Sequence, residues 1–183
     1  NGDGWVYCLH TDWDTCRNAS TGSAGSTTAT SRSNGVAAYF NTPSYILFRS
    51  FLPFDTSGAS SPVSATLNVY GYNVADSDTY AYEATAFSPL TTADYDNFST
   101  QLGSVTWATG QYNVITLSGV SNIGANAYYC LRESEFDVDG GTPISFGDNW
   151  NGLYFTDETG TSKDPYLEIT EGSGFTHPLM MVD

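Results

Sequence analysis

The chain has 183 residues, the size of one domain or of one domain with a tail, and it is long enough to bury a substantial core. Its formal net charge is −15, from 20 acidic and 5 basic residues, and such a surface repels nucleic acid and anionic membranes. No apolar run approaches the roughly 20 residues of a membrane span. We therefore expect no nucleic-acid partner and no membrane insertion.

Residue usage favours pleated sheets, because aromatic residues make up 15% of the chain and Thr, Ser, Val and Gly are abundant. Alternating apolar and polar residues, separated by turn formers, predict about ten short strands. In chain order we expect them at 3–10, 36–40, 45–54, 63–72, 79–87, 104–107, 111–117, 127–138, 151–156 and 164–170. This pattern predicts an all-β fold, an antiparallel, jelly-roll-like β-sandwich with short helical turns at 89–97 and 118–123.

The strand at 45–54 organises the rest, because it is apolar on both alternating faces and should lie at the centre of a sheet. Residues 63–72 alternate cleanly, as expected of a half-buried antiparallel partner.

Two arginines, Arg49 and Arg132, interrupt apolar strands and need buried or rim partners. We expect them to pair with Glu83, Glu133 or Glu168.

Three cysteines allow several redox states. Cys8 and Cys16 flank a short turn and could form a disulfide, which would leave Cys130 as a buried thiol on a strand. A link from Cys130 to either of the others, or three reduced thiols, are the competing arrangements. The chain starts with polar turn residues and no signal peptide, as expected of a mature or excised form.

Six segments together resemble one family. They are FRSFLPFDTS (48–57), SPVSATLNVYG (61–71), LTTADYDNF (90–98), QYNVITL (111–117), CLRESEFD (130–137) and SKDPYLEIT (162–170). In this order they resemble DNRLRE-type domains, and Leu131-Arg132-Glu133 matches the LRE signature letter for letter. These domains are β-sandwich modules of secreted bacterial and viral surface proteins, related to carbohydrate-binding modules. The resemblance implies an accessory, adhesive or structural module without catalysis of its own.

The residues themselves also give little support for catalysis. The histidines are His10 and His177, and neither lies in a nucleophile motif. Carboxylate pairs such as Glu133 and Glu135 have the spacing that a glycosidase needs, but so many acids make such pairs inevitable. We expect no enzyme and no catalytic residues.

A structural calcium ion is one interpretation of the alternating loop carboxylates Asp76 and Asp78, and Asp137 and Asp139. The competing interpretation is that these residues form solvated turns, where Asp is favoured in any case.

Sugar binding requires exposed aromatic faces beside polar side chains. Trp13 in one expected loop, and Asp148, Asn149 and Trp150 in another, offer this combination. The other two tryptophans, Trp5 and Trp107, follow strand patterns and should pack in the core.

We expect residues 1–171 to form the domain and 172–183 to form a flexible apolar tail. The tail residues Phe175, Leu179, Met180 and Met181 are candidates for docking on a neighbouring copy.

Two functions follow. The first is a non-catalytic module for adhesion or carbohydrate binding, located outside the cell, on its surface or on a virion. The second is a structural subunit, such as a virion decoration protein or an extracellular filament, held by the tail and by sheet edges as a homo-oligomer.

Overall fold

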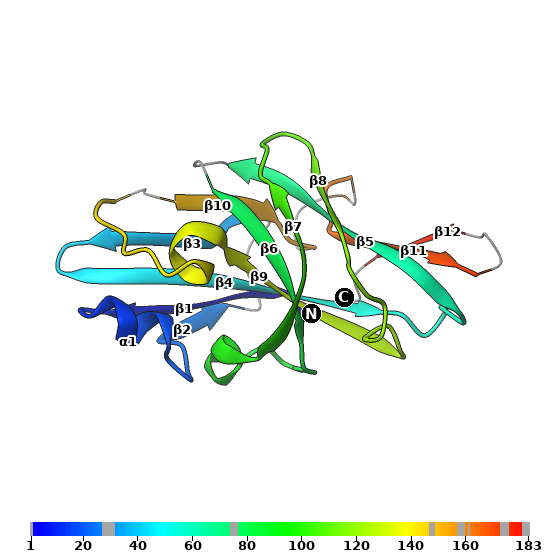
Figure 1. The fold of residues 1–183 in the computed structure, drawn as a ribbon, viewed down its shortest axis with the longest axis horizontal. Helices are drawn as coiled ribbons and strands as arrows, with labels where there is room; N and C mark the ends of the chain where they lie inside the picture. The colour runs from blue at the N-terminus through cyan, green and yellow to red at the C-terminus, as the bar shows by residue number, and fades with distance from the viewer. Residues whose placement is uncertain are drawn as a thin grey trace.

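The computed structural model describes residues 2–26, 32–73, 77–146, 149–156, 160, 162–172 and 176–180. The fold is all-β, as predicted, and every strand pairing within these residues is antiparallel (Figure 1). The strands are β1 (Gly4–His10), β2 (Ala24–Ser26), β3 (Arg32–Asn41), β4 (Ser44–Asp55), β5 (Pro62–Asn73), β6 (Asp78–Ala84), β7 (Phe98–Thr106), β8 (Tyr112–Thr116), β9 (Asn126–Glu133), β10 (Asn149–Tyr154), β11 (Tyr166–Glu171) and β12 (Thr176–Met180). The short helices are α1 (Trp13–Arg17), the 3-10 helix η1 (Thr92–Asp96) and the π-helix η2 (Ser134–Val138).

Strand β4 is central, as its apolar sequence predicted. It pairs with β1, β3 and β9. Phe51 lies opposite both Gly4 of β1 and Cys130 of β9, so these two strands run along opposite edges of β4. Strand β3 shares the edge used by β9, because β3 and β1 pair with the same first half of β4. Strands β6 and β7 extend the sheet beyond β9.

A second group of strands is built on β5, which pairs with β8 and β11, while β11 pairs with β12. These four strands lie together at the right of Figure 1. Strand β10 joins the two groups, because it pairs with both β3 and β5. The larger apolar core lies between the groups, where Leu52 and Phe54 of β4 meet Leu67 of β5 and Ile169 of β11.

The opposite face of β4 carries a second apolar cluster. Its residues include Leu47 and Phe51, and Tyr95 of η1 and Phe136 of η2 complete it. Successive β4 residues therefore point into two different clusters, because side chains alternate across a strand. This explains why β4 is apolar on both faces.

The prediction of a single strand over residues 127–138 was wrong. Strand β9 ends at Glu133, and η2 follows immediately. The Glu133 carboxylate accepts hydrogen bonds from the backbone N–H groups of Glu135 (2.7 Å), Phe136 (2.8 Å) and Asp137 (3.2 Å). A side chain that binds three successive amides turns the backbone away from the sheet.

The other expected local elements are partly confirmed. The helical turn at 89–97 is η1, and Asp94 accepts the backbone N–H of Thr91 at 2.8 Å, as in one half of a capping box. At 118–123 the chain forms a turn and no helix. The tail was expected to be flexible and without regular structure. Residues 176–180 instead form β12, which pairs with β11.

Candidate functional site

A surface of aromatic side chains crosses β1, β4, β3 and β10, and we call it the aromatic strip. Each ring contacts at least one other, with ring centroids 5.0–6.4 Å apart. The strip consists of Trp5, Tyr7, Phe48, Tyr39, Phe146 and Trp150.

The register of the strands brings these rings to one face. Tyr7 lies opposite Phe48, Phe48 opposite Ala37, and Ala37 opposite Trp150. Residues directly opposite each other in antiparallel strands point to the same side of the sheet, as do residues two apart along one strand. Trp5 is two residues from Tyr7 on β1, and Tyr39 is two residues from Ala37 on β3, so both lie on this face. Phe146 reaches it from the segment before β10.

The strip is accessible to solvent. Phe146 is 64% exposed and Tyr39 only 8%, while the remaining rings are partly exposed. Phe48 points to the same face of β4 as Leu52 and Phe54, which are buried beneath the second strand group. The strip is thus the continuation of a core face beyond the strands that cover it.

The three central rings have the most nearly parallel planes in the strip. The planes of Tyr7 and Phe48 make an angle of 34°, and those of Phe48 and Tyr39 an angle of 21°. Burial, and secondarily the neighbouring Tyr7, raise the pKa of the Tyr39 phenol, which keeps its hydroxyl protonated. A protonated phenol is both a donor and an acceptor, so the strip combines apolar ring faces with hydroxyl groups.

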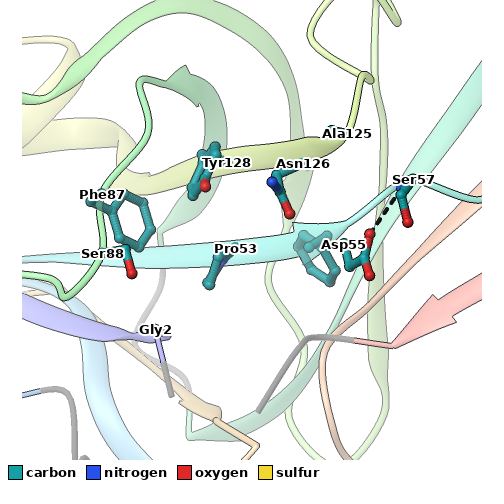
Figure 2. A pocket seen from close by; sticks show the side chains of 10 residues that line it. Gly2, Pro53, Asp55, Ser57, Phe87, Ser88, Ala125, Asn126 and Tyr128 are labelled. Carbon is teal, nitrogen blue, oxygen red and sulfur yellow. Dashed lines mark hydrogen bonds between the residues drawn. The ribbon is translucent and has the colours of Figure 1, made fainter.

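A separate pocket of about 360 Å³ lies at the far end of β4 (Figure 2). Phe87 and Tyr128 form its aromatic wall, with ring centroids 5.1 Å apart, and Asn126 and Asp55 add polar groups. Asp55 already accepts the backbone N–H of Ser57 at 2.9 Å, as drawn in Figure 2. This pocket has the size and mixed lining of a small-ligand site, and it is the second candidate.

The structure also contains a buried ion cluster, formed by Arg49 of β4, Arg132 of β9 and Asp137 of η2. Both arginines donate two hydrogen bonds to the Asp137 carboxylate, each with Nε at 2.9 Å and Nη2 at 2.7 Å. Asp137 is 0% exposed. The expected partners Glu83, Glu133 and Glu168 were therefore wrong for both arginines.

The cluster is enclosed by aromatic rings and backbone carbonyls. The Arg49 guanidinium lies 4.2 Å from the ring centroid of Tyr95, and that of Arg132 lies 4.3 Å from the ring centroid of Phe98. Burial by itself would raise the pKa of Asp137, but the charge of Arg49 and the hydrogen bonds of both arginines hold that pKa well below its usual range. The carboxylate therefore stays ionised, which makes the cluster a structural anchor.

Among the described residues, the predicted calcium ligands Asp78, Asp137 and Asp139 are not brought together as a cation site. Asp137 has both oxygens bound by arginines, whose positive charge disfavours a cation, and Asp139 is exposed at the end of η2. Asp78 begins β6, and Asp76 lies outside the described residues. Within the described ranges, no group of three or more His, Cys, Asp or Glu side chains is arranged to hold a metal ion.

The predicted sugar-binding residues have different environments. Trp13 is only 4% exposed, because it begins α1 and packs on Tyr45, so the expectation of an exposed loop aromatic was wrong. Asn149 is buried, and its amide donates to Glu133 (3.1 Å) and Glu135 (2.8 Å), which supports the start of η2. Trp150 does lie on an accessible surface, the aromatic strip. Asp148 lies outside the described residues.

Among the predicted assembly residues, Leu179 packs against the larger core beside Ile169. Met180 ends β12, with its side chain outside the description, and Phe175 and Met181 lie outside it entirely.

Sequence reasoning missed most of the strip. Trp5 packs against the larger core, as expected, but it also stays partly exposed, whereas Trp107 is buried as expected. The alternation of Trp5 and Tyr7, and the aromatic residue at Phe48, were visible signals. Nothing in the pattern indicated that this part of the face stays uncovered.

The chain matches no protein-family model, and the comparison with curated proteins gives no significant match. In the part of the chain that the structure describes, no helix has both the length and the apolar character that crossing a membrane requires.

Proposed function

We propose that the chain is a non-catalytic carbohydrate-binding module of a secreted or surface protein, and that the aromatic strip is its binding surface. One observation carries this proposal: a contiguous set of six rings, five of them at least partly exposed, crosses four strands. Soluble proteins seldom leave such a patch exposed without a binding role. Ring faces stack on the C–H faces of pyranose rings, and phenol hydroxyls bond to sugar hydroxyls.

The strip favours a long, uncharged polysaccharide over a small sugar. Its rings extend across four neighbouring strands, a width that accommodates several sugar units side by side. The chain carries a net charge of −15, so an anionic polysaccharide would be repelled. The resemblance to DNRLRE-type domains supports the same class of function and an extracellular, cell-surface or virion location.

The chemistry of the buried groups favours binding over catalysis. The carboxylate oxygens of Asp137 and Glu133 accept hydrogen bonds from arginines and backbone amides, which leaves them poorly placed to act on a substrate. Burial raises the pKa of the Cys130 thiol to about 12, so this thiol is a poor nucleophile at neutral pH.

Depletion binding to insoluble cellulose and chitin, with soluble neutral β-glucans and mannans in affinity gels, tests the proposal. Alginate, an anionic polysaccharide, tests the inference from charge. The informative variants are Trp150→Ala and Phe146→Ala on the strip and Tyr128→Ala in the pocket. Tyr72→Ala, an exposed tyrosine of β5, is the matched control.

We expect retention on at least one neutral polysaccharide. Losing one stacking ring should weaken it by about 1 kcal/mol, or about fivefold. Trp150→Ala and Phe146→Ala should show this loss, and Tyr72→Ala should not. A loss confined to Tyr128→Ala would move the site to the pocket, and no retention on any polysaccharide would refute carbohydrate binding.

The alternative is a subunit of an assembly. One observation weighs against growth by strand addition at β12: this strand pairs with β11 and carries Pro178, which lacks a backbone N–H to donate to a further strand. Light scattering of the purified chain separates the two proposals. Stable oligomers that dissociate on Trp150→Ala would make the strip a subunit interface instead of a glycan surface.

A further inference from the structure

Two of the three cysteines lie against each other. Cys8 is on β1, Cys16 is on α1, and both are buried in the apolar cluster beneath the short helices. All three cysteines are free thiols in the structure, and α1 packs directly against β1. Cys16 is the largest influence on the pKa of Cys8, which it lowers, and Cys8 is the largest influence on the pKa of Cys16, which it raises, as expected of two neighbouring thiols. A disulfide requires the two sulfur atoms to approach to about 2.05 Å.

The sheet register keeps Cys130 away from Cys8. Cys8 lies opposite Leu47 of β4, and Cys130 lies opposite Phe51 on the other edge of the same strand. Cys8 and Cys130 are offset by four residues along β4, which corresponds to about 13 Å. They are also separated by two strand spacings, or about 10 Å, in the perpendicular direction. The Cα atoms of Cys8 and Cys130 are thus roughly 16 Å apart, beyond the limit of about 7 Å for a disulfide.

We propose that Cys8 and Cys16 form a disulfide in oxidising surroundings and that it fastens α1 to β1. The sequence left three arrangements open. The packing of α1 on β1 and the position of Cys130 on the other edge of β4 favour this one. Cys130 then remains a buried thiol.

The surroundings of the two thiols determine which of them reacts first. The neighbouring Cys16 thiol lowers the pKa of Cys8, whereas Cys8 and burial raise the pKa of Cys16. Cys8, which is 5% exposed beside Ser23, is therefore the first nucleophile.

With oxidised glutathione as the oxidant, the Cys8 thiolate attacks one glutathione sulfur, and the other glutathione leaves as a thiolate. Cys16 then loses its proton and attacks the Cys8 sulfur, which releases the second glutathione. Two protein thiols are oxidised to one disulfide, and one glutathione disulfide is reduced to two thiols.

The crosslink would hold α1 in position, and α1 contributes part of the enclosure of the buried ion cluster. The backbone carbonyl of Arg17, the residue after Cys16, accepts a hydrogen bond from Arg49 Nη2 at 2.9 Å. The carbonyl of Cys16 itself accepts from the Tyr95 hydroxyl at 3.1 Å. Fixing α1 to β1 therefore holds two of the groups that enclose Arg49.

Peptide mapping of the intact chain, after equilibration with glutathione buffers of defined ratio and acid quenching, tests the proposal. Trypsin cleaves after Arg17, so Cys8 and Cys16 stay on one peptide, while Cys130 falls on another. A protease that cleaves before aspartate cuts at Asp12 and Asp14, between the two cysteines. Its products remain joined only if the disulfide is present.

We expect the oxidised peptide 1–17 to be lighter by two hydrogen atoms and to resist alkylation until it is reduced. Cys130 should alkylate only after denaturation. The oxidised chain should unfold at a higher temperature than the reduced chain, and Cys130→Ser, the matched control, should preserve this difference while Cys8→Ser removes it. If a variant does not fold, the peptide map of the wild-type chain tests the proposal by itself. Free Cys8 and Cys16 at the oxidising limit, or a linked peptide containing Cys130, would overturn the proposal.

Discussion

Replacing Asp137 by asparagine is the sharpest test of the buried ion cluster. The substitution keeps the shape of the side chain but removes its charge and one of its two acceptor oxygens. Asp137 accepts four hydrogen bonds from Arg49 and Arg132, and its side chain is 0% exposed. In Asp137→Asn, two buried guanidinium groups would face each other without an anion between them.

The expected cost is large. Removing one partner of a buried ion pair typically costs about 3–5 kcal/mol, because the remaining charge stays buried and unpaired. Small domains have a free energy of unfolding of only about 5–15 kcal/mol, so Asp137→Asn should lose a substantial part of it. Asp96→Asn is the matched control: this carboxylate is 54% exposed and 3.9 Å from Arg49, so its loss should cost less than about 1 kcal/mol.

Urea denaturation at pH 7, followed by tryptophan fluorescence, measures both variants. The midpoint for Asp137→Asn should fall far below those for wild type and Asp96→Asn, with an unchanged slope. If Asp137→Asn costs no more than Asp96→Asn, the arginines have another partner or reach solvent, and the anchor role is refuted.

The same carboxylate sets a pH dependence. The folded-state pKa of Asp137 lies below the ordinary value of 3.8 despite burial, because the two arginines stabilise the ionised form. Its contribution to stability is therefore complete above the unfolded-state pKa and is lost as pH falls through the folded-state pKa. The difference in unfolding free energy between wild type and Asp137→Asn should be constant near neutrality and shrink below about pH 5. A difference that grows on acidification would contradict this assignment.

Three further substitutions test the packing, each by the free energy of unfolding in urea. Trp13→Ala should cost about 3–5 kcal/mol because the side chain is buried, whereas Trp13→Phe should cost much less, since the indole N–H has no acceptor among the described residues. Gly71→Ala should cost about 1–3 kcal/mol because a Cβ there would lie only 2.1 Å from the Ala108 carbonyl oxygen, whereas Gly119→Ala, which meets open space, should be nearly neutral. Glu133→Ala should cost about 1–3 kcal/mol because three backbone N–H groups lose their acceptor; an effect as small as that of Gly119→Ala would mean that the η2 amides find other partners.

Local patterns determined much of the fold. The apolar faces of residues 45–54 identified the central strand, because a strand with two covered faces has no polar alternation to show. Alternation also located β1, β5 and β8, and the helical turn predicted at 89–97 is η1. These features depend on neighbours in sequence, so they can be read without the tertiary structure.

The candidate site depended on the tertiary structure. Arg49 and Asp137 are 88 residues apart, and no periodicity links them. Asp137 can bind both Arg49 and Arg132 only because the Glu133 side chain ends β9 and turns the chain into η2. Likewise, Trp13 and Trp150 both have polar sequence neighbours, yet Trp13 is buried at the start of α1 and Trp150 lies on a partly exposed surface. Burial is decided by which strands cover a face, and that is a property of the assembled sheet rather than of any single segment.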